Sequence, residues 1–148
     1  MFEINIKSSV EDYRVTFKPL DNSIYQDFDL LLVDSFFRNR TLFSDLPVVF
    51  IEATEQNKTL SSVEHICEEL ARHGLTRKSR ILAIGGGVVQ DLATIVASVY
   101  MRGISWSFAP STLTGMVDSC VGGKSSINVG AFKNLVGNVY PPKEIFID

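Results

Sequence analysis

Residue types that many classes of protein rely on are scarce in this 148-residue sequence. There are two cysteines, Cys67 and Cys120, and their positions offer neither a disulfide framework nor a metal-ligand spacing. The two histidines, His65 and His73, are not spaced as a ligand pair, and no serine–histidine–acid set can be assembled around them. These shortages fit a reducing compartment and argue against a metal site or a hydrolytic triad within this chain.

Long apolar runs and a strong net charge are lacking as well. The longest apolar run, LATIVASVYM, is about half as long as a membrane span requires. The first residues, MFEINIKSSVEDY, lack the basic region and apolar run of a secretory signal. The net charge of −3 provides no general attraction to nucleic acid. We therefore expect a cytoplasmic domain that binds neither membrane nor nucleic acid.

The remaining composition is that of a globular domain, with 45% hydrophobic and 21% charged residues. Alternation in FEINIKSS and RVTFK predicts an opening hairpin. Continuous apolar runs at residues 30–33 and in LPVVFIEA favour strands buried on both faces, which is typical of parallel sheets. With further strands in RILAIG, ISWSFAPS and EIFID, the pattern predicts an α/β fold, a Rossmann-like, mostly parallel sheet flanked by helices.

A helix is predicted within TLSSVEHICEELARHGL, with a capping box formed by Ser61 and Glu64 and a stop at Gly74. Its apolar residues recur at the spacing of one helical face. They are Val63, Ile66, Cys67, Leu70 and Ala71. A second helix is predicted after the glycines of RILAIGGGVVQDLATIVASVYMRG, and a short one in TLTGMVDS.

The glycines of ILAIGGGVVQD stand between a predicted strand and a predicted helix. Such a turn lets the backbone approach a phosphate, and the start of the helix offers free N–H groups. Its spacing is G-x-G-x-x-D rather than the G-x-G-x-x-G of the dinucleotide fingerprint, so a plain tight turn stays an alternative. VGGKSS is not a P-loop, because Asp118 stands where that motif requires a glycine.

The segment GMVDSCVGGKSSINVGAFKN, residues 115–134, gathers glycines, charges and amides and contains little that could fill a core. It holds Asp118, Lys124, Lys133 and Asn134, and Arg102 precedes it. Lysines and an arginine can hold an anion, while aspartate and asparagine can hydrogen-bond hydroxyls. These residue types point to a phosphorylated, hydroxylated small molecule bound beside a nucleotide.

Acidic residues also end two of the predicted strands. Asp34 and Glu52 stand where open α/β sheets bind ligands, and each could hold ribose hydroxyls or cap a turn. Glu55 and Lys58 follow in a loop-like segment and are typical of surface charge. Of the cysteines, Cys67 belongs to the apolar face of its helix, and Cys120 could be exposed.

Three motifs, GGGVVQDLATIVASVYMRG, PSTLTGMVDSCVGGKSSIN and KNLVGNVYPP, resemble those of the 3-dehydroquinate synthases and the wider sugar-phosphate cyclases in order and spacing. The resemblance is strong over residues 81–142 and weak over 30–60. It implies that residues 1–148 form an NAD-binding α/β domain, which in this family precedes a mostly helical domain with a catalytic divalent metal, zinc or cobalt. Because the glutamate and histidines of that metal site do not occur here, we expect one domain of a longer enzyme, inactive alone.

The resemblance also implies the roles of individual residues. Arg102 would reach the substrate phosphate of a neighbouring subunit, which implies a homodimer. The residues implied to line the substrate are Asp118, Lys124, Lys133 and Asn134. Those implied to bind NAD are Asp34, Glu55, Lys58, Gly86, Gly87, Val88, Asp91, Ser111, Thr112, Thr114, Asp118 and Lys133.

The implied reaction belongs to the shikimate pathway of aromatic amino acid biosynthesis and cyclises 3-deoxy-arabino-heptulosonate 7-phosphate. NAD oxidises a hydroxyl, phosphate leaves by elimination, the hydride returns, and an aldol-type step closes the ring. Gln90 stands where these enzymes usually have glycine, and Phe132 replaces the glycine usual before Lys133. Alternatives are therefore a cyclase for sedoheptulose 7-phosphate or glucose 6-phosphate, a non-catalytic nucleotide-binding module, or a metal-dependent alcohol dehydrogenase.

Overall fold

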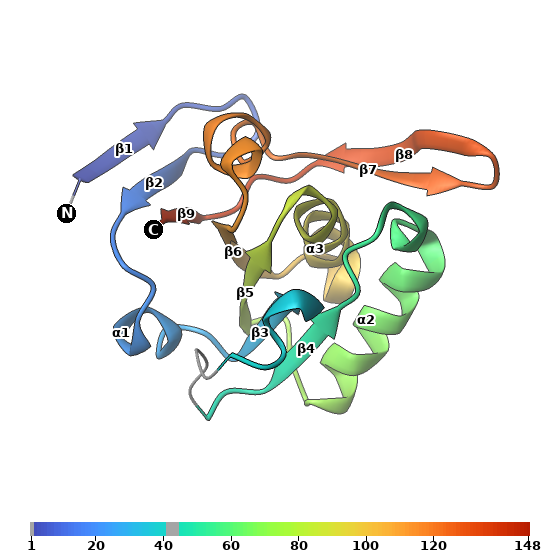
Figure 1. The fold of residues 1–148 in the computed structure, drawn as a ribbon, viewed down its shortest axis with the longest axis horizontal. Coiled ribbons are helices and arrows are strands. Elements are labelled where there is room, and N and C mark those ends of the chain that lie inside the picture. The colour runs from blue at the N-terminus through green and yellow to red at the C-terminus, as the bar shows by residue number, and fades with distance from the viewer. Residues whose placement is uncertain (1, 41–44) are drawn as a thin grey trace.

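The computed structural model describes residues 2–40 and 45–148 and contains a seven-stranded sheet in the order β1-β2-β9-β6-β5-β3-β4 (Figure 1). A separate hairpin is formed by β7 and β8. The strands are β1 Phe2–Ile6, β2 Tyr13–Phe17, β3 Leu30–Asp34, β4 Val48–Ile51, β5 Arg80–Gly85, β6 Ser105–Pro110, β7 Lys124–Val129, β8 Phe132–Val139 and β9 Glu144–Ile147. The α-helices are α1 Asn22–Tyr25, α2 Leu60–Arg72 and α3 Gly87–Val99. The shorter helices are η1 Ser35–Phe37, η2 Glu55–Asn57, η3 Tyr100–Arg102 and a π-helix, Gly115–Ser119.

The sheet has the predicted strand directions. Only β1 runs antiparallel, to β2, and the other described neighbours in the sheet are parallel. The opening hairpin and the mostly parallel α/β sheet are therefore confirmed. The strand predicted in EIFID becomes β9, which lies between β2 and β6 and joins the opening hairpin to the rest of the sheet.

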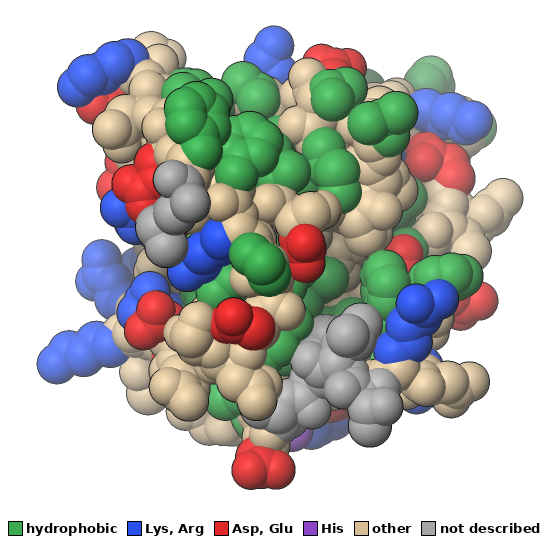
Figure 2. Space-filling model, turned by 60° about the vertical axis from the view of Figure 1, so that its left-hand side comes forward, with side chains coloured by type: hydrophobic (Ala, Val, Ile, Leu, Met, Phe, Trp, Pro, Cys, Tyr) green, Lys and Arg blue, Asp and Glu red, His purple; other side chains and the backbone are tan. Residues whose placement is uncertain are grey.

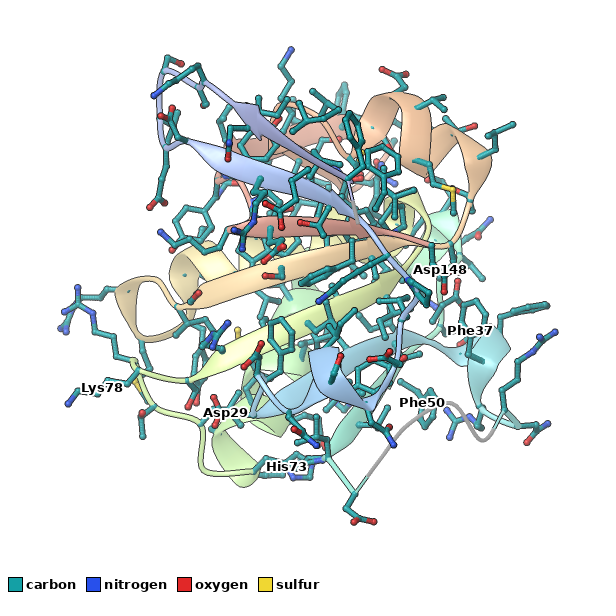
Figure 3. The ribbon with its side chains drawn as sticks, turned by 90° about the vertical axis from the view of Figure 1, so that its left-hand side faces the viewer. Asp29, Phe37, Phe50, His73, Lys78 and Asp148 are labelled. Atoms are coloured by element: carbon teal, nitrogen blue, oxygen red, sulfur yellow. The ribbon has the colours of Figure 1, made fainter. Side chains whose placement is uncertain are left out.

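Both faces of the central strands are buried, as their continuous apolar runs predict. Leu30, Leu32, Ile81 and Ala83 belong to the larger core, which also contains apolar residues of α2 and α3. The intervening residues of the same strands belong to a second core beside α1. Figure 1 shows α1 on one side of the sheet and α2 and α3 on the other, and α1 therefore lies in front of the sheet in Figure 3.

The helix α2 starts two residues earlier than the predicted capping box allows. Thr59 is the N-cap, and its Oγ1 accepts a hydrogen bond from the backbone N–H of Ser62 at 3.2 Å. The prediction that Ser61 and Glu64 form the cap is wrong, because Thr59 already leads into helical backbone from an extended conformation. The predicted stop is confirmed, since Gly74 adopts a left-handed conformation directly after the helix.

The hairpin of β7 and β8 was not predicted, because its glycines and polar residues hide the alternation of a strand. It projects as an arm beyond α2 and α3 (Figure 1). A Cβ atom on Gly137 would lie 1.9 Å from the backbone oxygen of Ser125 in the facing strand, so only glycine permits this pairing. Gly137 therefore serves the close approach of the two strands.

The face turned forward in Figure 2 carries apolar side chains gathered in its upper part, with charged side chains mostly around the margin. Large apolar residues that are exposed in β1, in β2 and between residues 113 and 121 are Phe2, Ile4, Phe17, Leu113, Val117 and Val121. Within the described residues, no helix has the length and apolar character to cross a membrane.

Candidate functional site

The point where the direction of strand connection reverses lies between β3 and β5. From β3 the chain moves outward to β4, whereas from β5 it moves to β6 on the opposite side. Ligands of open α/β sheets bind at the carboxyl ends of strands beside such a point. Asp34 ends β3, and Gly85 ends β5, with Gly86 and Gly87 directly after it at the start of α3. Figure 3 shows this edge at Phe37 and Asp148, whereas Asp29 and Lys78 lie at the opposite edge.

The three glycines at the junction of β5 and α3 differ in what surrounds them. A Cβ on Gly85 would lie 2.5 Å from Cγ2 of Val89, and one on Gly86 would lie 3.1 Å from Cγ2 of Thr112, so both permit close packing. A Cβ on Gly87 would have no heavy atom within 4 Å. The N-cap of α3, Gly86, makes no side-chain cap. The first N–H groups of α3 are therefore open to an anion that approaches beside Gly87.

A pocket of about 480 Å³, which we call the α3 pocket, lies between α3, the π-helix and β7. It joins the start of α3 to the charged segment that the sequence singles out. Its lining residues are Gly87, Gln90, Asp91, Asp118, Ser119, Val121, Lys124, Ser125 and Ser126. An open glycine, two carboxylates, a lysine and serine hydroxyls suit an anionic ligand that carries hydroxyl groups.

Lys58 is buried against Asp91, which lines this pocket, although the sequence setting of Lys58 is typical of surface charge. Its Nζ lies 2.7 Å from Oδ1 of Asn134 and 3.0 Å from Oδ2 of Asp91. Glu55 Oε1 lies further away, at 3.6 Å. One ammonium group thus connects η2, the start of α3 and the hairpin, and so fixes the hairpin against the helix.

The carboxylate of Asp91 is held from two sides. Burial raises its pKa, while the hydrogen bond and charge of Lys58 and the backbone N–H of Ser126 act in the opposite direction. The N–H of Ser126 donates to Asp91 Oδ1 at 3.2 Å. Because Lys58, at the end of η2, occupies the other oxygen, Asp91 is positioned by Lys58 and β7 together before any ligand arrives.

Asn128 connects the remaining members of this cluster. Its Nδ2 donates to Glu55 Oε1 at 2.9 Å, and this hydrogen bond is the main reason that the pKa of Glu55 is lowered. Its Oδ1 accepts from the N–H of Asn134, whose φ of 53° is left-handed. Glu55 and Asn128 line a second pocket, of about 370 Å³, together with Lys133. The cluster therefore forms the wall between two neighbouring pockets.

Gln90 is buried between α3 and the π-helix, with 3% of its surface exposed. Its Nε2 donates to the carbonyl of Ser119 at 2.5 Å. Its Oε1 is buried with no hydrogen-bond partner, and no other described side chain has such an atom. Leaving a buried acceptor unpaired costs about 1–3 kcal/mol, so this position is not optimised for stability alone.

The structure brings most of the candidate residues to one edge of the sheet but divides them between pockets. Asp91, Asp118 and Lys124 line the α3 pocket, whereas Lys133 lines the second pocket. Ser111 lines a third pocket of about 280 Å³ on the α1 side, with mainly apolar neighbours. Thr112 packs against Gly86, and its hydroxyl accepts from the N–H of Gly115.

Other candidates take local structural roles or lie apart. Val88 lies in the first turn of α3, and Thr114 is the N-cap of the π-helix. Asp34 caps η1, because its Oδ1 accepts from the N–H of Phe36 at 3.0 Å. Arg102 is exposed at the far end of α3, about 20 Å of helix away from Gly87.

Sequence reasoning missed two polar residues of the site, Ser126 and Asn128, and it noted Gln90 only as a departure from the family's usual glycine. Ser126 and Asn128 are two residues apart in β7, which places both on one face of the strand. Recognition of β7 as a strand would have identified them. Cys120 was considered as an exposed thiol, but it is 1% exposed and burial raises its pKa. A reactive thiol at this position is therefore excluded.

No group of three or more histidine, cysteine, aspartate or glutamate side chains that could hold a metal ion occurs within residues 2–40 and 45–148. The donor set of the α3 pocket instead suits a dinucleotide and a polyol. The open space at Gly87 and the uncapped start of α3 fit a pyrophosphate, and the carboxylates fit hydroxyl groups.

Comparison with known proteins agrees with this arrangement. A family model described as "3-dehydroquinate synthase N-terminal" matches residues 48–148. The 3-dehydroquinate synthase of Clostridium tetani (strain Massachusetts / E88) is 37% identical over 145 residues, which are 98% of this chain and 36% of that protein. That of Alkaliphilus metalliredigens (strain QYMF) is 46% identical over 103 residues, 70% of this chain and 29% of that protein. The chain thus spans about a third of the length of these relatives.

Among solved structures, a crystal structure of 2-deoxy-scyllo-inosose synthase complexed with carbaglucose-6-phosphate, NAD+ and Co2+ superposes with a TM-score of 0.83. It is 27% identical, and the match covers 99% of this chain and 46% of that one. An iron-containing alcohol dehydrogenase from Corynebacterium glutamicum shares the fold at 15% identity and a TM-score of 0.66.

Proposed function

This chain belongs to the 3-dehydroquinate synthase family, whose N-terminal region it matches, and on that premise we propose that it is the NAD-binding part of a sugar-phosphate cyclase. The observation that carries this proposal is the α3 pocket. There the open glycine at the start of α3 lies beside Asp91, Asp118 and Lys124. A dinucleotide bound beside a phosphorylated polyol needs both the open glycine and these charged residues. A module that binds only a nucleotide has no use for the charged residues.

In the proposed complex the N–H groups at the start of α3 hold the pyrophosphate of NAD, and Asp34 holds a ribose hydroxyl. Asp34 can do so with Oδ2, because Oδ1 is occupied by the cap of η1. NAD, when bound, supplies the temporary oxidation of a substrate hydroxyl. Lys124 binds anionic oxygen of the substrate, and Asp118 hydrogen-bonds its hydroxyls.

The divalent metal of this reaction would be bound by residues outside this chain. We therefore propose that the catalytic unit includes a second domain, and that the 148-residue chain alone does not turn over substrate. The protein is also proposed to act in the cytoplasm. We further propose a homodimer, because the resemblance assigns Arg102 to the substrate phosphate, and Arg102 lies in η3, beyond the far end of α3 and too far from the α3 pocket of its own subunit.

The proposed substrate is 3-deoxy-arabino-heptulosonate 7-phosphate, because the two relatives described above, 37% and 46% identical, are 3-dehydroquinate synthases. A second candidate is another sugar phosphate. It is supported by the similarity to an enzyme that binds carbaglucose-6-phosphate, although the identity there is 27%. A difference in substrate would involve Gln90 and Phe132, the two positions where this chain departs from the family's usual glycines.

Phosphate release by the protein that carries this chain tests the proposal, with NAD and a divalent metal present. The panel comprises 3-deoxy-arabino-heptulosonate 7-phosphate, sedoheptulose 7-phosphate and glucose 6-phosphate. Release from the first alone is expected and would establish the proposed substrate. Release from one of the others alone would support the second candidate, and no release from any would contradict a cyclase.

A further inference from the structure

The buried carboxamide of Gln90 stands out within α3. Most of the helix is apolar and buried, and its other buried polar side chain, Thr94, is satisfied because its hydroxyl donates to the backbone oxygen of Gln90 at 2.7 Å. Gln90 satisfies only one end of its side chain, the Nε2 that donates to Ser119. A glutamine that served packing alone would gain nothing from its unpaired Oε1.

The single hydrogen bond of this side chain reaches the segment that carries Asp118. Ser119 is the last residue of the π-helix and follows Asp118 directly. The π-helix is followed by Gly122 and Gly123, which both have positive φ, so the segment after it is built from permissive backbone. Gln90 is thus a polar tether from the rigid α3 to a short helix that carries a pocket carboxylate.

We propose that Gln90 is a positioning residue that holds Asp118 in the wall of the α3 pocket through the carbonyl of Ser119, and thereby determines affinity for the hydroxyl-bearing substrate. The inference rests on the proposed function, because Asp118 is assigned there to substrate hydroxyls. Gln90 acts through another residue, because it lines the pocket but its Nε2 donates to the protein backbone.

Two variants separate this role from packing. Gln90→Met keeps the length of the side chain, removes the donor and also removes the unpaired acceptor. The thermal midpoint should therefore stay within about 3 °C of the wild type or rise, whereas the KM for the sugar phosphate should increase about fivefold, as expected for one lost hydrogen bond. The kcat should change by less than about twofold, because the tether acts on binding.

Gln90→Glu keeps the shape but places a second acceptor opposite the carbonyl of Ser119, so its KM should exceed that of Gln90→Met. Thr94→Val is the matched control, since it removes the other buried polar group of α3, outside the pocket, and should leave KM unchanged. The measurements are thermal unfolding and phosphate release by the complete protein, with NAD saturating.

An unchanged KM in Gln90→Met, beside normal turnover by the wild type, would overturn this role and leave the proposed function intact. A thermal midpoint lowered by more than about 5 °C, with kcat reduced and KM unchanged, would assign the carboxamide to packing and overturn it too. Absence of turnover by the wild type on all three sugar phosphates would contradict the proposed function, and the role of Gln90 with it.

Discussion

At the scale of single residues, the site depends on charges that are buried against each other. Lys58 is 7% exposed and has carboxylate and amide oxygens around its Nζ. A buried ammonium group is tolerated only when its partners satisfy it, and a partner carboxylate left alone is costly. Lys58 therefore has a structural role in this chain whether or not it also touches a ligand.

Replacing Lys58 with methionine should lower the free energy of unfolding by about 3 kcal/mol, because Asp91 then stays buried without its counter-charge. Urea unfolding at neutral pH measures this loss. Lys7→Met is a suitable control, since Lys7 also pairs with an aspartate but its side chain is 90% exposed, and no measurable change is expected. Equal stability of the Lys58 variant and the wild type would contradict a satisfied buried pair.

At the scale of elements, the strands and the two long helices could be predicted because their periodicity reflects which face is buried. The apolar run at residues 30–33 became the buried strand β3, and the face of α2 buries Val63, Ile66 and Leu70. The hairpin of β7 and β8 could not be predicted in the same way. Most of β8 is exposed, so no apolar face has to alternate along it.

The candidate site, too, could be predicted from the sequence only in part. Asp118 and Lys124 could be predicted because carboxylates and lysines are unusual among glycines, and the resemblance adds Asp91. The division of Lys124 and Lys133 between two pockets depends on the pairing of β7 with β8. The partner of Gln90 depends on a contact between residues 29 positions apart, which no local pattern specifies.

The strands β7 and β8 should separate when Gly137 is replaced by alanine. The added Cβ would overlap the backbone oxygen of Ser125, so the strands would separate at a cost of about 2 kcal/mol or more. The backbone amides of residues 124–139 should lose their protection against hydrogen exchange. Gly130→Asn at the turn is the control, because that glycine has open space around it and asparagine accepts a left-handed backbone. Retained protection in the Gly137 variant would contradict the close pairing.

The junction of β2 and β9 should depend on pH through Glu144. Partial burial opposes ionisation, but hydrogen bonds from Arg14 and Thr16 lower the pKa below its ordinary value of 4.5. A lowered folded pKa stabilises the fold above the unfolded pKa, and this contribution is lost as the pH falls through the folded value. Glu144→Gln should therefore lose about 1 kcal/mol at pH 7, and this deficit should shrink as the pH falls below 4.5.

Chemical unfolding of both proteins across this pH range measures the difference. A deficit that persists unchanged near pH 3 would mean that the charge of Glu144 does not stabilise the junction. A deficit that grows as the pH falls would reverse the sign required by the lowered pKa.

At the scale of the whole molecule, the proposed homodimer would place Arg102 of one subunit in the site of the other, because Arg102 lies too far from the α3 pocket of its own subunit. Arg102→Ala and Lys124→Ala should each abolish phosphate release by the complete protein. Mixed in equal amounts, they should recover about a quarter of the wild-type activity, because half of the dimers are mixed and each mixed dimer has one intact site. No recovery, despite subunit exchange shown by differently tagged chains, would contradict the shared site.

The most direct test of the central claim is a calorimetric titration of this chain with NAD, beside the Gly87→Ala variant. Gly87 has open space around its Cβ position, so alanine should leave stability unchanged while it obstructs the pyrophosphate. One NAD should bind per wild-type chain, and Gly87→Ala should bind it at least about tenfold more weakly while its thermal midpoint stays unchanged. No binding to the wild type at millimolar NAD, or equal binding by both, would contradict an NAD site at the start of α3.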